Sequence, residues 1–399
     1  MTIHRKTLGK LAFSTFLVVA AFSQANAQDA AAVAERLKAV LAINGMELAW
    51  TGVTGDAASM VIEGTTLGVP GEAQKVPLGN VTLTDIKEEN GGLVIGGVAL
   101  PDYTHTEDGV TMDINGVTMA GIRLPAEGST DPVANLMMYD TADVANISFK
   151  MGDKTAFQMT DTHFEVTPPA DGKAMEFSGA AEKFTADLSL IEDPQSKPVI
   201  EALGYSQING FFELEGSWNP SDGRMALSQY DITVENAGTY GMTFDLGGYT
   251  PEFIKQLQEM QKQIAAQPEG ADSSAQGLAM LGLMQQLTFH SASIRWDDDS
   301  LTGKVLEFVG KSQGMSAADV ANQAKAVVPF LLAQLNNPEL TQQATAAVTK
   351  YLDDPQSLEI VAEPADAVPF ALIMAGAMSP SPQDLVKTLG VTVEANDGE

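Results

Sequence analysis

Cysteine is absent from all 399 residues of the chain. Disulfide bonds and cysteine nucleophiles are therefore excluded, and so is a lipid anchor attached to a cysteine. Stability must then come from a hydrophobic core. Apolar residues make up 44% of the chain, which is enough for one large domain or two modest ones.

Positive charge is also scarce. The chain has 22 Lys and Arg against 52 Asp and Glu, and its formal net charge is −30. Nucleic-acid binding needs clustered cations that displace counterions, so we expect no nucleic-acid partner. Anionic lipid headgroups are poor surface partners for the same reason. The acidity favours solubility and by itself indicates no function.

Catalytic motifs are missing as well. His105, His163 and His290 stand far apart and form no zinc-binding pair. The chain has no Gly-x-Ser-x-Gly nucleophile motif and no glycine-rich phosphate loop. A glycosidase needs only two carboxylates, but aromatic residues, which bind sugar rings, are only 7% of the chain. We expect no cofactor and assign no catalytic residue, while a glycan hydrolase that uses a carboxylate pair stays open as an alternative.

Long apolar runs are confined to the N-terminus. A basic segment precedes an apolar run at residues 11–22, and Ala25-Asn26-Ala27 supplies the small residues of a cleavage site. This pattern predicts a secretory signal peptide at residues 1–27. The run is shorter than the roughly 20 apolar residues of a spanning helix. We therefore expect export to the periplasm and a mature chain without a transmembrane segment.

Residues 28–190 are predicted to be a helix followed by an antiparallel β region. Apolar residues recur at helical spacing over Asp29–Ile43, and from Met46 onward apolar and polar residues alternate in short runs. Asn-Gly and Asp-Gly pairs favour two-residue hairpin turns. They separate these runs at Asn90-Gly91, Asp108-Gly109, Asn115-Gly116 and Asp171-Gly172.

Residues 191–399 are predicted to be an α+β region with hairpins and C-terminal helices. A capping residue followed by proline favours a helix start, and this pattern occurs at Asp193, Thr250, Asn337 and Ser381. Ser316 and Asp319 form a capping box, and Pro329 should kink or break the helix that follows. The fold class is therefore α+β. We expect a long antiparallel meander or curled sheet packed with amphipathic helices, concentrated in the C-terminal half.

Two acidic clusters are weak candidates for a metal or catalytic site. The first has the densest group of ligand-type side chains in the chain: Asp102, His105, Glu107 and Asp108. It directly precedes Gly109 and also has the composition of a polar hairpin loop, which we favour.

The second candidate is the run of three aspartates in "SIRWDDDSLTGKVLEF", with Asp297 and Asp299 as possible ligands. A calcium loop of the EF-hand type needs glycine at its sixth position and glutamate at its twelfth. Thr302 and Phe308 occupy these positions, so the pattern fails. Asp and Ser favour turns, and we predict a chain reversal here. The segment that begins at Leu301 fits either a strand or a helix.

The 18 methionines are compatible with two roles. Many lie in or beside predicted strands, where methionine usually fills a core but also adapts to irregular apolar ligands. Trp50, Trp218 and Trp296 lie in β-like runs near turns, where sheet packing is the more common role. A curled sheet closed by amphipathic helices would provide a concave apolar site.

Two segments resemble a known protein family. Residues 203–246, "LGYSQINGFFELEGSWNPSDGRMALSQYDITVENAGTYGMTFDL", and 297–320, "DDDSLTGKVLEFVGKSQGMSAADV", are similar to uncharacterised periplasmic proteins of alphaproteobacterial origin. The similarity covers roughly Ala202 to Asn396. More loosely, the strand-rich organisation resembles AsmA-type envelope proteins, which bend a long sheet into an apolar groove and pass lipids along it. That resemblance implies a soluble carrier or accessory role and transfers no residue-level function.

These observations favour two functions. The first is a periplasmic protein that binds an apolar or amphipathic, lipid-like ligand in a β-sheet groove in support of envelope maintenance. The second is a ligand-free structural or assembly factor of the cell envelope, with an envelope protein as its partner.

Overall fold

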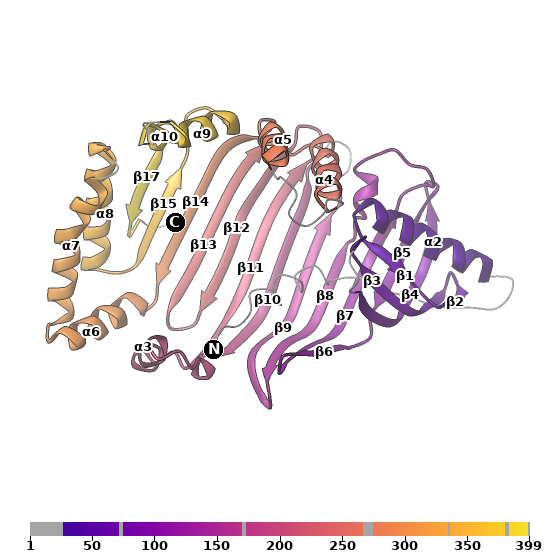
Figure 1. The fold of residues 1–399 in the computed structure, drawn as a ribbon, viewed down its shortest axis with the longest axis horizontal. Coiled ribbons are helices and arrows are strands. Elements are labelled where there is room, and N and C mark those ends of the chain that lie inside the picture. The colour runs from indigo at the N-terminus through magenta and orange to yellow at the C-terminus, as the bar shows by residue number, and fades with distance from the viewer. Residues whose placement is uncertain are drawn as a thin grey trace. The chain divides into compact units, whose positions relative to one another are not determined.

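The computed structural model describes residues 27–71, 75–169, 173–265, 274–333, 336–379 and 383–397. The predicted signal peptide lies outside these ranges apart from Ala27, and so does the predicted turn at Asp171-Gly172. In the described ranges, seventeen strands form an antiparallel sheet, and most helices lie in the C-terminal half (Figure 1). The predicted α+β class is confirmed.

The chain forms two compact units. Unit 1 contains residues 1–179 and 250–280, and unit 2 contains residues 180–249 and 281–399. The division falls inside strand β10 (Met175–Asp187), which pairs with β9. Each unit is described by itself below.

Unit 1 consists mainly of consecutive antiparallel strands after one helix, α2 (Ala27–Ile43). It also contains the 3-10 helix η1 (Ala134–Leu136) and α4 (Pro251–Ala265). Most strands pair with their successors, while β1 pairs with β3 and β5 pairs with β7. The strands are β1 (Glu47–Ala49), β2 (Gly52–Asp56), β3 (Ser59–Gly68), β4 (Val76–Glu89), β5 (Gly92–Ala99), β6 (Tyr103–Glu107), β7 (Val110–Leu124), β8 (Thr141–Met151) and β9 (Lys154–Thr167).

Two of the predicted hairpin turns are confirmed, and one is wrong. Asn90-Gly91 and Asp108-Gly109 have positive φ at both residues and connect paired strands. Asn115-Gly116 lies inside β7 instead. Gly116 has φ +64°, and a Cβ there would stand 2.7 Å from the Cβ of Ala145. The glycine bends β7 where its pairing changes from β6 to β5, so the strand continues without reversing.

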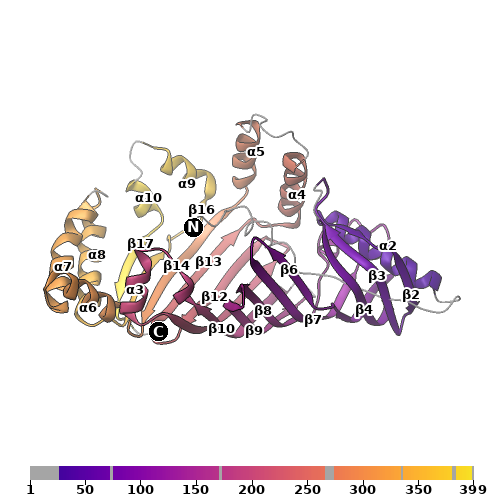
Figure 2. The same ribbon diagram turned by 60° about the horizontal axis from the view of Figure 1, so that its bottom comes forward.

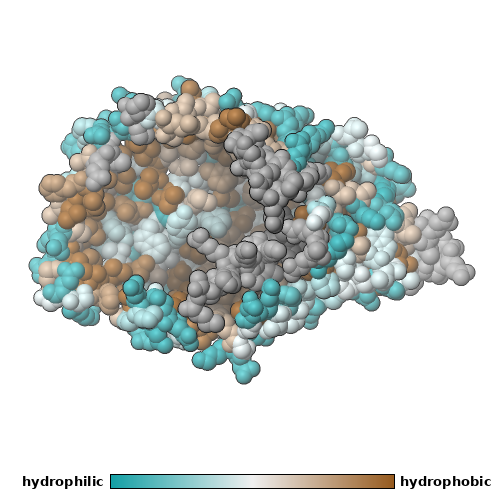
Figure 3. All heavy atoms as spheres, in the orientation of Figure 1, coloured by the Kyte–Doolittle hydropathy of each residue, from teal (hydrophilic) through white to brown (hydrophobic). Residues whose placement is uncertain are grey.

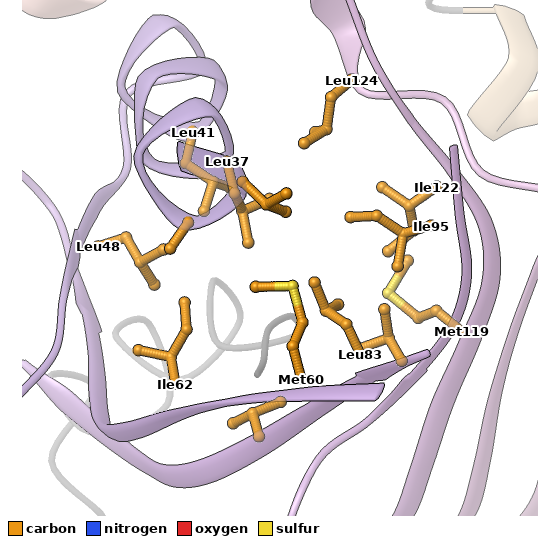
Figure 4. Packing of buried hydrophobic residues seen from close by; sticks show 14 of the residues in the cluster. Leu37, Leu41, Leu48, Met60, Ile62, Leu83, Ile95, Met119, Ile122 and Leu124 are labelled. Atoms are coloured by element: carbon orange, nitrogen blue, oxygen red, sulfur yellow. The ribbon is translucent and has the colours of Figure 1, made fainter. Parts of the chain in front are cut away.

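Helix α2 supplies one side of the core of unit 1. Its apolar residues recur every three or four positions, so they share one face of the helix. Ala34, Leu37 and Leu41 are fully buried on this face. They pack against strand side chains that include Met60 and Ile62 (Figure 4). The predicted N-terminal helix is confirmed, and it covers the strands that follow it.

We predict that Leu37→Ala lowers the free energy of unfolding by about 2–5 kcal/mol, because the substitution leaves a cavity in a dry core. Ile43→Ala, at the exposed end of the same helix, is the control and should cost about 1 kcal/mol or less. Urea unfolding followed by circular dichroism measures both variants. Equal losses would contradict the placement of α2 in the core.

Unit 2 is built on a second run of antiparallel strands. β11 to β15 pair in chain order, β17 pairs with β15, and β16 pairs with the start of β14. The strands are β11 (Gln207–Asn219), β12 (Arg224–Val234), β13 (Gly238–Gly247), β14 (Thr288–Asp298), β15 (Ser357–Ala362), β16 (Val368–Pro369) and β17 (Val391–Ala395).

Helices α7 to α10 of unit 2 stand on one side of this sheet (Figure 2). The helices of unit 2 are η2 (Leu188–Leu190), α3 (Ser196–Leu203), α6 (Leu301–Gln313), α7 (Ala317–Ala333), α8 (Pro338–Asp353), α9 (Phe370–Ala377) and α10 (Gln383–Thr388), while α5 (Ser274–Met284) spans the unit boundary. Among the described residues, no helix combines the length and apolar character needed to span a membrane.

Side-chain caps account for most of the predicted helix starts. Thr250 Oγ1 accepts from the Phe253 N–H, and Asn337 Oδ1 accepts from the Leu340 N–H. Asp193 accepts from the Gln195 and Ser196 N–H groups, just before α3. Ser381 lies outside the described residues.

Helices α6 and α7 test further predictions for the C-terminal half. The capping box of Ser316 and Asp319 forms at the start of α7. Pro329 lies inside α7, which continues to Ala333, so of the predicted kink or break the break does not occur. The segment after Ser300, which fitted either a strand or a helix, is helix α6.

Candidate functional site: an apolar sheet face

The strand register of unit 2 sorts its side chains onto two faces. Residues directly opposite each other in an antiparallel sheet point to the same face, and so do residues two positions apart on one strand. Ile294 on β14 lies opposite Met242 on β13 and Ile360 on β15. Trp296, two positions along, lies opposite Leu358 and on the same face.

This apolar face continues across the sheet of unit 2. Following the register outward from β14, its members carry no charge apart from Asp298, which lies two positions beyond Trp296. The uncharged members include Phe212, Leu214, Tyr230, Ile232, Val234, Tyr240, Met242, Phe244, Ala292, Ile294, Trp296, Leu358, Ile360, Ala362, Val391, Val393 and Ala395.

The opposite face of the same strands is polar. Arg295 forms ion pairs with Asp297 at 2.7 Å and with Glu359 at 3.3 Å. Hydrogen bonding to Asp297 raises the pKa of Arg295, so this cation stays charged. Hydroxyl pairs join neighbouring strands on this face, including Thr243 and Ser293 at 2.9 Å. The alternation therefore places most of the charges on one side of the sheet and most of the apolar side chains on the other.

Helix α8 covers one end of the apolar face. Ala347 and Tyr351 of this helix pack with Ala395, Trp296 and Leu358. α8 does not cover the next row along the strands. In that row Ile294 is 48% exposed and Ile360 is 49% exposed. The surface of this part of unit 2 is hollowed, and apolar residues gather there over β14, β15 and α8 (Figure 3).

A pocket of about 570 Å³ adjoins the far end of this face. It lies between the segment 363–372 and the segment 387–390. These segments directly follow Ala362 and directly precede Val391, which face each other as the last pair of β15 and β17. The pocket is lined by apolar side chains such as Leu372, by the cation of Lys387 and by the carboxylates of Glu363 and Asp366.

The structure disperses the first acidic cluster over the β6–β7 hairpin. Asp102 Oδ1 accepts from the Gly116 N–H at 3.2 Å, which ties the loop before β6 to the bend in β7. His105 and Glu107 lie on β6 with 3.9 Å between Nε2 and Oε2, and Asp108 forms the turn. Throughout the described ranges, no group of three or more His, Cys, Asp or Glu residues is placed to hold a metal ion.

The three aspartates of the second cluster have three different surroundings. Asp297 points to the polar face and binds Arg295, while Asp299 is exposed. Asp298, which sequence analysis did not select, accepts from the Thr302 N–H at 2.9 Å and from the Trp296 Nε1–H at 3.1 Å.

Asp298 therefore joins three elements. Its carboxylate also accepts from the Tyr351 hydroxyl of α8 at 3.4 Å and from the Thr302 hydroxyl at 2.7 Å. Burial raises the pKa of Tyr351, so the phenol stays a donor. The segment between Asp298 and Leu301 is a short connection from β14 to α6. A polar residue two to four positions before a helix, followed by threonine in the first turn, is the signal that could have identified Asp298.

We predict that Asp298→Ala lowers the free energy of unfolding by about 2–3 kcal/mol, because the change leaves the indole and backbone donors without their acceptor. Asp299→Ala alters an exposed carboxylate and should change stability by about 0.5 kcal/mol or less. Thermal unfolding of both variants with and without calcium measures the difference. Stabilisation of the wild type by calcium that is lost in Asp299→Ala would instead support a metal site.

Comparison with known proteins gives one match. Residues 231–396 match a protein family described as "Uncharacterized protein". The match covers less than half of the chain and begins in β12, so it includes β13 to β17 and the helices α4 to α10. A comparison with curated proteins gave no match.

Proposed function

We propose that this chain is an exported periplasmic protein that binds an apolar or amphipathic, lipid-like ligand on the apolar face of unit 2, in support of envelope maintenance. One observation carries the proposal. Ile294 and Ile360 stand opposite each other on an apolar sheet face, and each is about half exposed. An apolar surface of this kind is usually a binding site in a soluble protein.

The chemistry of the face favours an acyl chain as the ligand. The backbone groups of the inner strands are paired within the sheet, so the face presents mainly side chains. A peptide or a glycan lying there would leave its own polar groups without partners, at a cost of about 1–3 kcal/mol for each group. An acyl chain carries no such groups. Each methylene that it buries gains about 0.8 kcal/mol before the cost of ordering the chain.

Export is supported by the sequence pattern of residues 1–27, which has a basic segment, a short apolar run and small residues at the cleavage position. A periplasmic location would give the apolar face access to membrane lipids. The family match carries no functional description, so it neither favours nor opposes this assignment.

The two other hypotheses have weaker support. An envelope protein partner could cover the same apolar face, and the experiment below separates that outcome. A glycan hydrolase needs a carboxylic acid with a raised pKa. Asp113, Asp193 and Asp319 have a resolved change, and hydrogen bonds lower the pKa of each.

We predict that Ile294→Ser combined with Ile360→Ser weakens binding of a fluorescent long-chain fatty acid. Each change removes apolar contact worth about 1 kcal/mol, so together they should raise the Kd by roughly tenfold or more. Fluorescence titration of the purified full chain measures the Kd, after intact mass has established its N-terminus. Because both side chains are half exposed, the variant should keep its thermal stability.

The control is Val361→Ser, which changes the next residue of β15 on the opposite, polar face. This variant should bind the probe as the wild type does. Native mass spectrometry of protein from its own host then tests for a bound lipid at a fixed ratio. A wild type that binds no acyl probe and carries no lipid, but crosslinks to one envelope protein through β14 or β15, would replace the carrier function with the assembly function.

A further inference from the structure

The pocket at the far end of β15 and β17 carries charges of both signs. Helices α9 and α10 lie side by side at this end of the two strands (Figure 1). The segment before α9 supplies the carboxylates of Glu363 and Asp366, and the end of α10 supplies the ammonium group of Lys387. The cation and the carboxylates thus come from the two different segments that line the cavity.

These opposite charges do not neutralise one another across the pocket. Among the described residues, every ion pair lies elsewhere. A purely anionic ligand would bind Lys387 but would also face two carboxylates, and a purely cationic ligand would face Lys387. A ligand that carries one charge of each sign could form favourable contacts with both segments at once.

The pocket continues into the apolar face of unit 2. Leu246 on β13 lies two positions beyond Phe244, so it points to the apolar side, and Phe289 on β14 is opposite Leu246. A bulge in β14 shifts its alternation here and turns Phe289 to this side. Val368, which is buried and lines the pocket, lies opposite Phe289 in turn. Roughly 15 Å of strand separates Phe289 from the half-exposed Ile294.

A close backbone contact holds the two charged segments together. Gly390 has φ +61°, and a Cβ at this position would collide with the carbonyl oxygen of Glu363. Glycine adopts this left-handed conformation without steric cost and lets the two main chains touch. The contact fixes the segment that carries Glu363 and Asp366 against the segment that carries Lys387, so the pocket does not depend on side-chain packing alone.

We infer that the ligand of the apolar face is a zwitterionic lipid whose head group occupies this pocket. Its anionic group lies beside Lys387, and its cationic group lies beside Glu363 and Asp366. The inference rests on the proposed function, whose ligand class it names. The acyl chain leaves the pocket past Val368 and covers the half-exposed row of β14 and β15. A few polar groups that orient a mostly apolar ligand are typical of such sites.

Calorimetric titration of the purified full chain tests the head-group site. Three ligands have an acyl chain of the same length and differ in charge. Lauroyl lysophosphatidylethanolamine is zwitterionic, whereas lauroyl lysophosphatidylglycerol and dodecanoic acid are anionic, and each is added below its critical micelle concentration. We predict that the zwitterionic lipid binds at least about threefold more tightly than either anion, because the anions gain one charge contact and meet two repulsive carboxylates.

Substitutions that remove one sign of charge should change this preference. Glu363→Gln combined with Asp366→Asn should weaken binding of the zwitterionic lipid about three- to fivefold and tighten binding of dodecanoic acid, because the carboxylates are gone. Lys387→Gln should weaken binding of both ligands. The matched controls are Glu394→Gln, on the polar face of β17, and Lys311→Gln, at an exposed position of α6. Both should bind as the wild type does, and circular dichroism confirms that each variant is folded.

The outcomes distinguish this inference from the proposed function. Equal binding of the three ligands, unchanged by the pocket variants, would leave the apolar face as an acyl-chain site and refute the head-group site. Control variants that lose as much binding as the pocket variants would also refute it. If none of the three ligands binds, the proposed function falls and the inference falls with it.

Phosphoethanolamine, the head group without an acyl chain, separates a lipid from a small zwitterion. It should not displace the lysolipid, because the acyl chain supplies most of the apolar contact. Displacement at concentrations similar to those of the lysolipid would mean that the pocket takes a small zwitterionic molecule, and it would overturn the assignment of a lipid.

Discussion

Cross-strand register is the constraint on which the rest of unit 2 depends. Pairing of β14 with β13 and β15 fixes Ile294 opposite Met242 and Ile360, and it fixes Arg295 opposite Glu359. A shift of one residue would exchange these two sets between the faces and bury the arginine under α8. The ion pairs on one face and the apolar packing on the other therefore support the same register, and the exposed apolar surface is a consequence of it.

Helices cover the apolar strand faces of the two units to different extents. In unit 1, α2 lies against the strands, and its leucines meet Met60 and Ile62 in a fully buried core. In unit 2, α8 reaches the Trp296 row, where Asp298 ties strand, helix start and Tyr351 together. The next row, Ile294 and Ile360, is left half exposed. A carrier needs this combination, because a rigid sheet must hold its shape while one part of its apolar surface stays open to a ligand.

Local patterns in the sequence determined much of the fold, because their physics is local. Helix α2, the caps at Thr250 and Asn337, and the turns at Asn90-Gly91 and Asp108-Gly109 depend on spacing and on nearby hydrogen bonds. The same Asn-Gly signal gave a wrong turn prediction at residues 115–116. β7 stays paired with strands on both of its sides, so the chain bends there but does not reverse. Asp298, rather than Asp297 or Asp299, is the aspartate that joins β14 to α8. This role depends on Tyr351, a partner far away in the sequence. The exposure of Ile294 and Ile360 was decided by where α8 ends on the sheet. Only the tertiary structure sets that position, because helix coverage is a long-range packing property that no local pattern encodes.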